Sequence, residues 1–358
     1  MTYRVIQWGT GSVGKLALRE VLKNPEFELA GVKAYSDGKV GVDAGALCDM
    51  PATGIKAMKE PLLRKGDTVL YCPIVADYDE IAMMLRAGAN VVTTASNVYP
   101  QFYGPGVYDK INDAGIAGGA TFHGSGVNPA FMSEVLPLTL SGLVHRARKI
   151  TVREVSDVNH YASTAPEIML DHVGFGKSPA DALNADAFLK GMTAYFSESI
   201  LMICDYLGVK LDRIDERHEV ATAKHRVTLD NGRTIEPGTV GCRLFRWIAI
   251  VGGEPRIELS TFWKVTSELE PQWNVSDSKL VEWTVSVEGT PSVRCTIATC
   301  ASFDPDNPDY LKGGEEAAIL ATAIHAVNAI PYVHAAAPGV KTFLDLPIVA
   351  GRGAFRGL

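Results

Sequence analysis

The sequence predicts an α/β protein in which a doubly wound parallel sheet is followed by a second, α+β domain with a largely antiparallel sheet. Short apolar strands alternate with helix-spaced segments over roughly the first 150 residues, an order typical of parallel sheets. A glycine-rich turn joins the first of these strands to the first helix. Further along the chain, longer strand-like stretches are separated by hairpin-turn signals such as Asp230-Asn231-Gly232.

The chain has 358 residues, which is enough for two domains. We expect a first domain over residues 1–149, a second over 150–312, and a C-terminal segment over 313–358 that returns to the first domain and closes its sheet. The strands predicted for the first domain are 3–8, 27–35, 68–75, 90–94 and 118–123, and those for the second are 150–159, 220–229, 239–251, 256–265, 279–288 and 292–298. Helices are predicted over 185–207 and over 315–328, the latter interrupted by Ile330-Pro331.

The glycine-rich turn directly follows the strand at 3–8, and apolar residues then recur at helical spacing. In Rossmann-type folds the first glycine of such a turn permits a tight bend, the second lets the backbone approach a pyrophosphate, and the third lets the helix pack against the strand. The helix N-terminus then faces the phosphates. The alternative is an ordinary glycine turn before a helix. We expect a dinucleotide to bind the turn formed by Gly9, Thr10, Gly11, Ser12, Val13 and Gly14.

The end of the second strand is expected beside the adenosine ribose of that dinucleotide. An NAD site places a carboxylate there, and Asp37 comes 23 residues after Gly14. Ser36 and Lys39 could instead hold a 2′-phosphate by hydrogen bond and charge, with Tyr35 beside them. A solvated polar turn is the remaining alternative. We expect NADP or NAD as the cofactor and favour NADP slightly.

Open α/β sheets bind ligands beyond the carboxyl ends of their strands, so later strand ends are expected to line the same cofactor. A turn near residue 124 has the sequence Gly-Ser-Gly-Val-Asn-Pro and contributes to the same edge. The residues expected to contact the cofactor here are Cys72, Pro73, Ala95, Ser96 and Asn128.

Composition limits the remaining possibilities. The formal net charge is −7, which argues against nucleic-acid binding and against a membrane-surface role. No apolar run of about 18 residues is evident, and the chain opens with a strand, so neither a membrane span nor a signal peptide is expected. The six cysteines form no C-x-x-C pair, which predicts reduced thiols, no metal site and a cytoplasmic location.

Several segments together resemble one family of oxidoreductases. These are the glycine-rich turn, the turn near residue 124, Val173-Gly174-Phe175-Gly176, Glu288-Gly289-Thr290-Pro291-Ser292 and Ala326-Val327-Asn328-Ala329-Ile330-Pro331. The chain resembles the dihydrodipicolinate-reductase-like oxidoreductases, in particular 2,4-diaminopentanoate dehydrogenases and native amine dehydrogenases. The resemblance implies a nicotinamide cofactor, a small-molecule substrate held in a cleft between the domains, and a homodimer formed through the sheet of the second domain.

Two departures from that family affect the expected chemistry. Dihydrodipicolinate reductases carry a His-His-x-x-Lys motif, which the comparable region, Asn159-His160-Tyr161-Ala162-Ser163-Thr164, lacks. Amine dehydrogenases carry a glutamate in the loop after the strand that here spans 90–94. In this chain Asn97, or less plausibly Ser96, holds that position. Neither side chain can act as a carboxylate base at neutral pH.

We therefore predict an NAD(P)-dependent oxidoreductase that transfers hydride to or from a carbonyl or imine of a small, partly apolar substrate. The protein must polarise that group with donors near the developing charge. The catalytic candidates are Asn97, His160 and Tyr161, with His123 as a further possibility. Glu154 is expected only to pair with an arginine. A catalytically silent nucleotide-binding sensor or scaffold is the alternative, and an amine dehydrogenase with another residue in place of the glutamate stays open.

Overall fold

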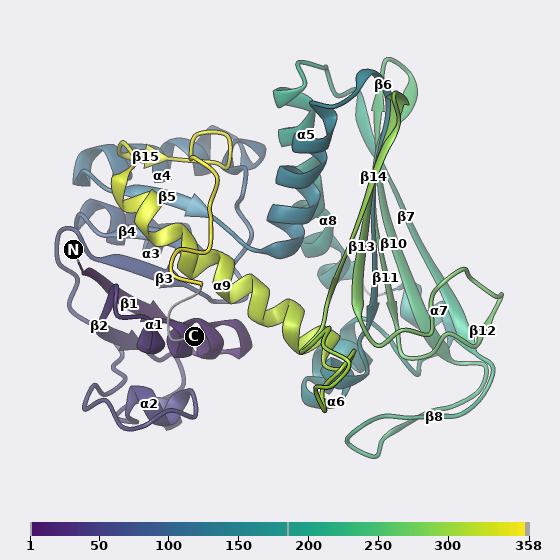
Figure 1. Ribbon diagram of the computed structural model, residues 1–358, viewed down its shortest axis with the longest axis horizontal. Coiled ribbons are helices and arrows are strands. Elements are labelled where there is room, and N and C mark those ends of the chain that lie inside the picture. Colours follow the sequence, from purple (N-terminus) through teal and green to yellow (C-terminus); the bar gives the residue numbers. More distant parts are fainter. Residues whose placement is uncertain (1, 185, 355–358) are drawn as a thin grey trace. The chain divides into compact units, whose positions relative to one another are not determined.

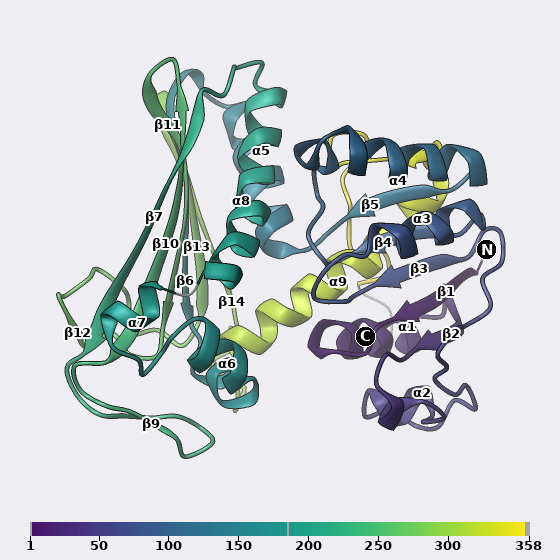
Figure 2. The same ribbon diagram turned by 180° about the vertical axis from the view of Figure 1, so that it is seen from behind.

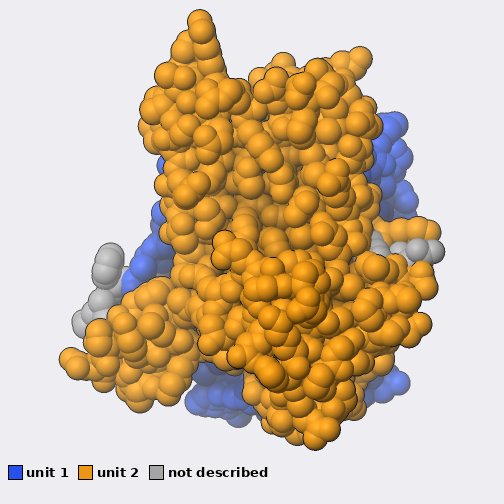
Figure 3. Space-filling model, turned by 90° about the vertical axis from the view of Figure 1, so that its right-hand side faces the viewer, with its two compact units in different colours: residues 1–131, 319–358 blue, residues 132–318 orange. Residues whose placement is uncertain are grey.

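The computed structural model describes residues 2–184 and 186–354, and the chain divides into two compact units. Unit 1 comprises Met1–Phe131 and Ile319–Leu358, and unit 2 comprises Met132–Ala318 (Figure 3). Residues 132–149 and 313–318 therefore belong to unit 2, not to the first domain and the C-terminal segment where the sequence placed them. Leu138 gives a physical reason for the first difference, because its side chain is buried in the core of unit 2.

Unit 1 is built on a six-stranded sheet with the order β15-β5-β4-β3-β1-β2, and every neighbouring pair is parallel (Figure 1). Its strands are β1 (Tyr3–Trp8), β2 (Phe27–Lys33), β3 (Thr68–Tyr71), β4 (Asn90–Thr93), β5 (Thr121–Gly124) and β15 (Gly339–Val340). The helices of this unit before residue 120 are α1 (Ser12–Lys23), η1 (Asp37–Lys39), α2 (Ala44–Leu47), α3 (Tyr78–Arg86), η2 (Pro100–Tyr103) and α4 (Pro105–Gly118).

Helices cover both faces of this sheet. Because successive side chains of a strand point to opposite faces, Val5 and Leu70 enter the core that α1 covers. Ile6 and Val69 enter the core that α3 and α4 cover. The predicted doubly wound parallel sheet is confirmed.

The last helix, α9 (Gly314–Ala335), continues through Pro331 instead of breaking there. Ile330 and Val333 on either side of the proline are fully buried in the core shared with α1, and this burial offsets the backbone hydrogen bond that proline cannot donate. By length and composition α9 could cross a membrane, contrary to the sequence-based expectation, but 39% of its apolar window is buried inside the protein. Its packing is that of a core helix, and the chain after it returns to pair β15 with β5.

Unit 2 is built on a seven-stranded sheet with the order β12-β7-β10-β11-β6-β13-β14 (Figure 2). All its neighbouring strands are antiparallel except β11 and β6. The strands are β6 (His145–Asp157), β7 (Arg213–Ala223), β10 (Val240–Val251), β11 (Glu254–Lys264), β12 (Leu269–Glu270), β13 (Val281–Thr290) and β14 (Val293–Thr299). The predicted α+β domain with a largely antiparallel sheet is confirmed.

One face of this sheet is covered by α8 (Asp186–Tyr206), where Phe196 stacks on Trp247 at 4.2 Å between ring centroids. The other helices around the unit are η3 (Val127–Val135), α5 (Leu136–Ser141), α6 (Asn159–Thr164), η4 (Glu167–His172) and α7 (Pro179–Leu183). The strand predicted at 220–229 is wrong in its bounds, because β7 begins at Arg213 and a small hairpin of β8 (Val227–Thr228) and β9 (Thr234–Ile235) follows it.

Glu154 was expected to pair with an arginine, but its carboxylate accepts hydrogen bonds from two tryptophans instead. Its two carboxylate oxygens accept hydrogen bonds from the indole N–H groups of Trp263 (2.9 Å) and Trp283 (2.8 Å), and one also accepts from Ser156 Oγ (2.9 Å). The side chain is buried at β6, so this carboxylate holds together three adjacent strands of the sheet.

Candidate functional site

The glycine-rich turn lies in unit 1 between β1 and α1, and its three glycines have different physical reasons to be glycine. Gly9 has a positive φ of +89°, which side chains disfavour. A Cβ on Gly14 would lie 2.2 Å from the carbonyl oxygen of Gly9, so no larger residue fits without moving the backbone. Gly11 has an ordinary φ of −74°, and no described atom lies within 4 Å of the position that a Cβ would take there. Its surroundings are therefore open.

The buried side chain of Gln7 stabilises the turn through a hydrogen bond, and the sequence analysis did not identify this residue. Gln7 Nε2 donates to the carbonyl oxygen of Gly9 at 2.9 Å and lies 3.5 Å from that of Leu70. The backbone of Cys72 lies 3.4 Å from the Cβ position of Gly9, so Cys72-Pro73 borders the turn. Its contact with a cofactor stays a prediction. Burial raises the pKa of the Cys72 thiol, so the thiol is neutral at pH 7.

Two lysines, Lys39 and Lys59, make polar contacts in the region after β2. Lys39 Nζ donates to the carbonyl oxygen of Thr10 at 2.7 Å and so reaches back to the glycine-rich turn. The carboxylate of Asp37 is 2.6 Å from Lys59 Nζ, and that ion pair holds the pKa of Asp37 below its usual value. Ser36 begins η1, and its side chain makes no capping hydrogen bond there.

Tyr35 is half-exposed and hydrogen-bonded at its phenol oxygen. The hydroxyl donates to Glu80 at 2.7 Å and accepts from the indole N–H of Trp8 at 3.1 Å. Partial burial and the Glu80 carboxylate raise the pKa of Tyr35, so its hydroxyl stays protonated. Lys33 Nζ lies 5.0 Å from the Trp8 ring centroid and 5.4 Å from that of Tyr35. Trp8 and Tyr35 are therefore joined by a hydrogen bond, and Lys33 contacts both of their rings.

The loop after β4 has two consecutive residues with positive φ, Ser96 (+59°) and Asn97 (+64°). Asn97 is only 1% exposed. Its Oδ1 accepts from the Tyr78 hydroxyl and its Nδ2 donates to the carbonyl oxygen of Ala95, both at 2.9 Å. The amide therefore braces the loop, and a direct catalytic role for it stays a prediction.

The turn near residue 124 brings together residues that are distant in sequence. Ser125 Oγ lies 2.9 Å from His325 Nδ1, and His123 Nδ1 lies 2.8 Å from the carbonyl oxygen of Lys341. Burial lowers the pKa of His123 and of His325 to about 4, so both imidazoles are neutral at pH 7. Asn128 precedes a cis proline in the same turn. The turn containing Ser125 was singled out from the sequence, but its contact with His325 was not foreseen, because nothing local joins two residues 200 positions apart.

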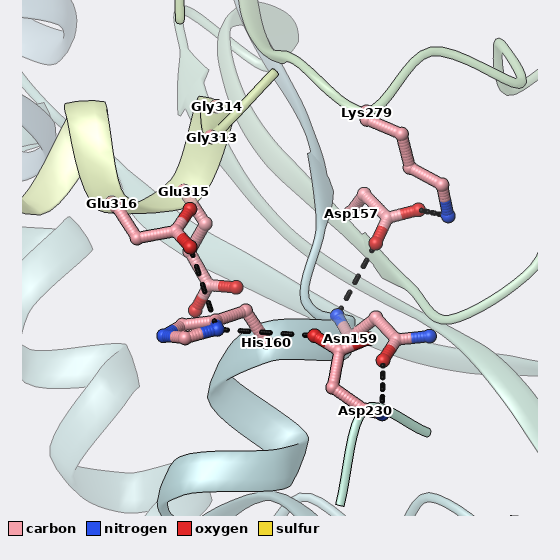
Figure 4. Close-up of a pocket in the computed structure, with 9 residues that line it drawn as sticks. All are labelled: Asp157, Asn159, His160, Asp230, Lys279, Gly313, Gly314, Glu315 and Glu316. Carbon is pink, nitrogen blue, oxygen red and sulfur yellow. Dashed lines mark hydrogen bonds and ion pairs between the residues drawn. The ribbon is translucent and has the colours of Figure 1, made fainter. Parts of the chain in front are cut away.

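The two remaining catalytic candidates, His160 and Tyr161, lie in the first turn of α6 in unit 2. His160 lines a pocket of about 170 Å³ (Figure 4). His160 Nδ1 is 3.4 Å from Glu316 Oε1 and 3.8 Å from Asp230 Oδ2. Burial raises the pKa of the Tyr161 phenol, which stays a hydrogen-bond donor at neutral pH. The residues that line this pocket are Asp157, Asn159, His160, Asp230, Lys279, Gly313, Gly314, Glu315 and Glu316.

Glu315 is the residue of this pocket that sequence reasoning passed over. It lies in the first turn of α9, where acidic residues are common, so its sequence context gave no warning of burial. Its Oε2 accepts from the backbone N–H of Tyr161 at 3.0 Å, and its Oε1 is buried without a hydrogen-bond partner among the described residues. Burial is the main cause that raises the pKa of Glu315 to about 8.

All the predicted cofactor-binding residues belong to unit 1, as does Asn97, whereas His160 and Tyr161 belong to unit 2. The structure brings the Gly9–Gly14 turn together with Lys39 and Cys72, and it brings His160 and Tyr161 together with Glu315. Joint action of Asn97 with His160 and Tyr161 stays a prediction.

Comparison with known proteins gives matches over nearly the whole chain. The family described as the 2,4-diaminopentanoate dehydrogenase C-terminal domain matches residues 131–355. An amine dehydrogenase from Streptomyces virginiae is 32% identical, with 96% of each chain covered. The 2,4-diaminopentanoate dehydrogenase of Acetoanaerobium sticklandii is 24% identical, with 99% of this chain and 96% of the relative covered.

Solved structures show the same fold at lower identity. An amine dehydrogenase from Mycobacterium smegmatis superimposes with a TM-score of 0.73 at 18% identity, covering 98% of this chain and 97% of that one. An apo scyllo-inositol dehydrogenase from Lactobacillus casei gives a TM-score of 0.51 at 14% identity, covering 92% of this chain and 88% of that one.

Proposed function

Because this chain belongs to the 2,4-diaminopentanoate dehydrogenase family and is an oxidoreductase, we propose that it transfers hydride between a nicotinamide dinucleotide and a carbonyl or imine carbon. The glycine-rich turn carries this proposal. A diphosphate needs a backbone free of side chains at a helix N-terminus, and the open space around Gly11 together with the close packing at Gly14 fits that need. A bound reduced nicotinamide supplies the hydride.

We propose that the cofactor is held by the residues that the sequence suggested around this turn. Backbone N–H groups from Gly11 to Gly14 would bind the diphosphate, and the segments at Cys72-Pro73, Ala95-Ser96 and Asn128 would line the rest of the cofactor. Three observations favour NADP over NAD. Lys39 is tied to the turn, Lys59 neutralises Asp37, and Ser36 makes no capping bond in its own helix. Two cations beside a neutralised carboxylate suit a 2′-phosphate better than a bare ribose diol.

Asn97, His160 and Tyr161 remain the proposed catalytic residues, with His160 and Tyr161 as the donors that polarise the reacting group. Asn97 would act by shaping its loop, since both ends of its amide are already bonded. The Tyr161 hydroxyl stays protonated and can donate to a developing negative charge. The loop lacks a carboxylate, and the relatives are named for amine substrates, so both a carbonyl and an imine are proposed as the reacting group. We also propose a homodimer and a cytoplasmic location.

Replacing Gly11 by Val tests the cofactor site directly. The backbone tolerates Val there and no described atom opposes its Cβ, so the variant should keep the thermal unfolding midpoint of the wild type. NADPH affinity, measured by fluorescence titration, should fall at least about tenfold, because the side chain would occupy the diphosphate position. Gly106, in α4, also has open space at its Cβ position, and Gly106→Val is the matched control that should keep its affinity.

Activity is tested by NADPH oxidation with a panel of ketones and aldehydes, each with and without ammonia. Turnover with any member supports the proposal. Unchanged NADPH affinity in Gly11→Val, or an absence of cofactor binding in the wild type, would overturn it.

A further inference from the structure

A serine and a histidine from distant parts of the chain meet at the carboxyl end of β5. Ser125 is 2% exposed, and its Oγ lies 2.9 Å from Nδ1 of His325, near the middle of α9. Both residues belong to unit 1, which also contains the glycine-rich turn and the other residues proposed to hold the cofactor. The proposed function gives neither side chain a role.

The imidazole of His325 is fixed in orientation by aromatic neighbours. Its ring centroid lies 5.7 Å from that of Phe131, edge to face, and 5.6 Å from that of Phe343. Burial lowers the pKa of His325 to about 4, so the ring is neutral at pH 7. One nitrogen of a neutral imidazole donates and the other accepts, so Nδ1 and the Ser125 hydroxyl share a single hydrogen bond.

The backbone of the turn after β5 adopts a conformation that needs support. Ala130 is fully buried and has a φ of +134°, which residues with a side chain rarely adopt. Such a conformation costs free energy and persists only where its surroundings fix it. Cγ2 of Thr322, three residues before His325 in α9, lies 3.7 Å from the position that a Cβ would take on Gly126. Two successive turns of α9 therefore contact this part of the backbone.

The same turn packs against the loop that follows β4. A Cβ on Gly124 would overlap the carbonyl oxygen of Asn97, and the Ser125 N–H donates to the carbonyl oxygen of Thr93 at 2.8 Å. In the sheet, β1 separates β2 from β3, β4 and β5. Because the adenosine ribose is expected after β2, a dinucleotide seated on the glycine-rich turn extends its other half along the carboxyl ends of β3, β4 and β5. The turn after β5 therefore lies on the side expected for the nicotinamide.

We propose that Ser125 and His325 are a positioning pair for the nicotinamide half of the cofactor. Their hydrogen bond holds residues 124–130 in the conformation that binds the nicotinamide and its ribose. Ser125 is buried and acts through the backbone that follows it, so neither side chain needs to touch the reacting carbon. This inference rests on the proposed function and deepens it, because it assigns the shape of the nicotinamide subsite to a contact with α9.

The experiment compares the whole cofactor with a fragment that lacks the nicotinamide. NADPH and 2′-phospho-ADP-ribose are titrated calorimetrically into the full chain, with NADH and ADP-ribose in parallel. His325→Phe keeps a ring between the aromatic neighbours but removes the polar atom, so it should raise the dissociation constant for NADPH at least about fivefold and that for the fragment less than about twofold. His325→Asn carries a polar atom at the position of Nδ1 and should recover most of the lost affinity.

Ser125→Ala is the second test of the same bond and also serves if His325→Phe does not fold. It should reproduce the loss seen in His325→Phe, and the double variant should lose no more than either single one, because all three lack the same hydrogen bond. His225→Asn is the matched control, since its side chain is 74% exposed in unit 2, and it should keep both affinities.

The outcomes separate this inference from the proposed function. An equal loss of affinity for NADPH and for the fragment in the His325→Phe and Ser125→Ala variants would show a merely structural bond and overturn the inference, as would unchanged affinity for both. Either result leaves the proposed cofactor site intact, because the wild type still binds the dinucleotide. A wild type that binds neither NADPH nor NADH would overturn the proposed function and this inference with it. Gly11→Val should weaken NADPH and the fragment alike, because both contain the diphosphate.

Discussion

Glu315→Gln should make the protein more stable at alkaline pH than the wild type, and by an amount that depends on pH. The folded state raises the pKa of Glu315 from 4.5 to about 8. Stability from this carboxyl is therefore fully present below about pH 4.5 and is lost as the pH rises through about 8. Glutamine cannot ionise, so the variant does not undergo that loss.

The magnitude follows from the size of the pKa shift. Each pKa unit corresponds to about 1.4 kcal/mol, so a shift from 4.5 to about 8 gives an upper limit of about 5 kcal/mol. The difference in free energy of unfolding between variant and wild type should be close to its minimum near pH 5. It should then grow by up to about 1.4 kcal/mol per pH unit and level off above about pH 8.

Urea unfolding between pH 5 and pH 9, followed by tryptophan fluorescence, measures this difference. Four of the five tryptophans, Trp247, Trp263, Trp273 and Trp283, lie in unit 2, so the signal reports mainly on the unit that contains Glu315. Glu254→Gln, at an exposed carboxylate at the start of β11, serves as the control and should differ from the wild type by a constant amount. If the Glu315→Gln difference is also the same at every pH, the carboxyl is not buried in the way described and the reasoning is refuted.

Three further predictions concern packing and cofactor choice. Gly14→Ala should destabilise the fold by about 1–3 kcal/mol, because its Cβ would meet the Gly9 carbonyl oxygen at 2.2 Å; an unchanged thermal midpoint would contradict this close packing. Glu154→Leu should lower the free energy of unfolding by about 2–5 kcal/mol, since it leaves two indole N–H groups unpaired, and chemical denaturation would reveal a smaller loss if water replaced the carboxylate. Lys39→Ala should raise the dissociation constant for NADPH more than that for NADH, by about fivefold or more, and equal effects on the two would argue against a 2′-phosphate contact at this lysine.

The fold of unit 1 could be predicted because its signals are local. Most strands of its sheet are short, largely buried runs, and the glycine-rich turn is contiguous in sequence. The bounds of β7 were missed because its first residues are mostly polar and partly exposed, which hides the apolar alternation. The passage of α9 through Pro331 depends on tertiary burial of Ile330 and Val333, which no local propensity contains.

The candidate site residues also fall into two groups: those with a local sequence signal and those that depend on tertiary contacts. The Gly9–Gly14 turn and the segment at Cys72-Pro73 follow from a motif and from strand ends. By contrast, Glu315 meets Tyr161 across 154 positions, and its unusual state arises only from burial between distant segments. A first-turn glutamate is ordinarily a solvated group, so the sequence pattern favoured the wrong environment.

Unit 1 is assembled from two separated stretches of chain, and this has a consequence for synthesis on the ribosome. Unit 2 is one continuous segment and is complete once residue 318 has emerged, whereas the core of unit 1 still lacks Ala326, Ile330 and Leu346 at that moment. The amino-terminal half of unit 1 must therefore wait, with apolar surface uncovered, until the last forty residues arrive. A nascent chain stalled just after residue 318 should accordingly be cut by protease within unit 1 while unit 2 resists, and chaperones that hold exposed apolar surface should bind it at that stage.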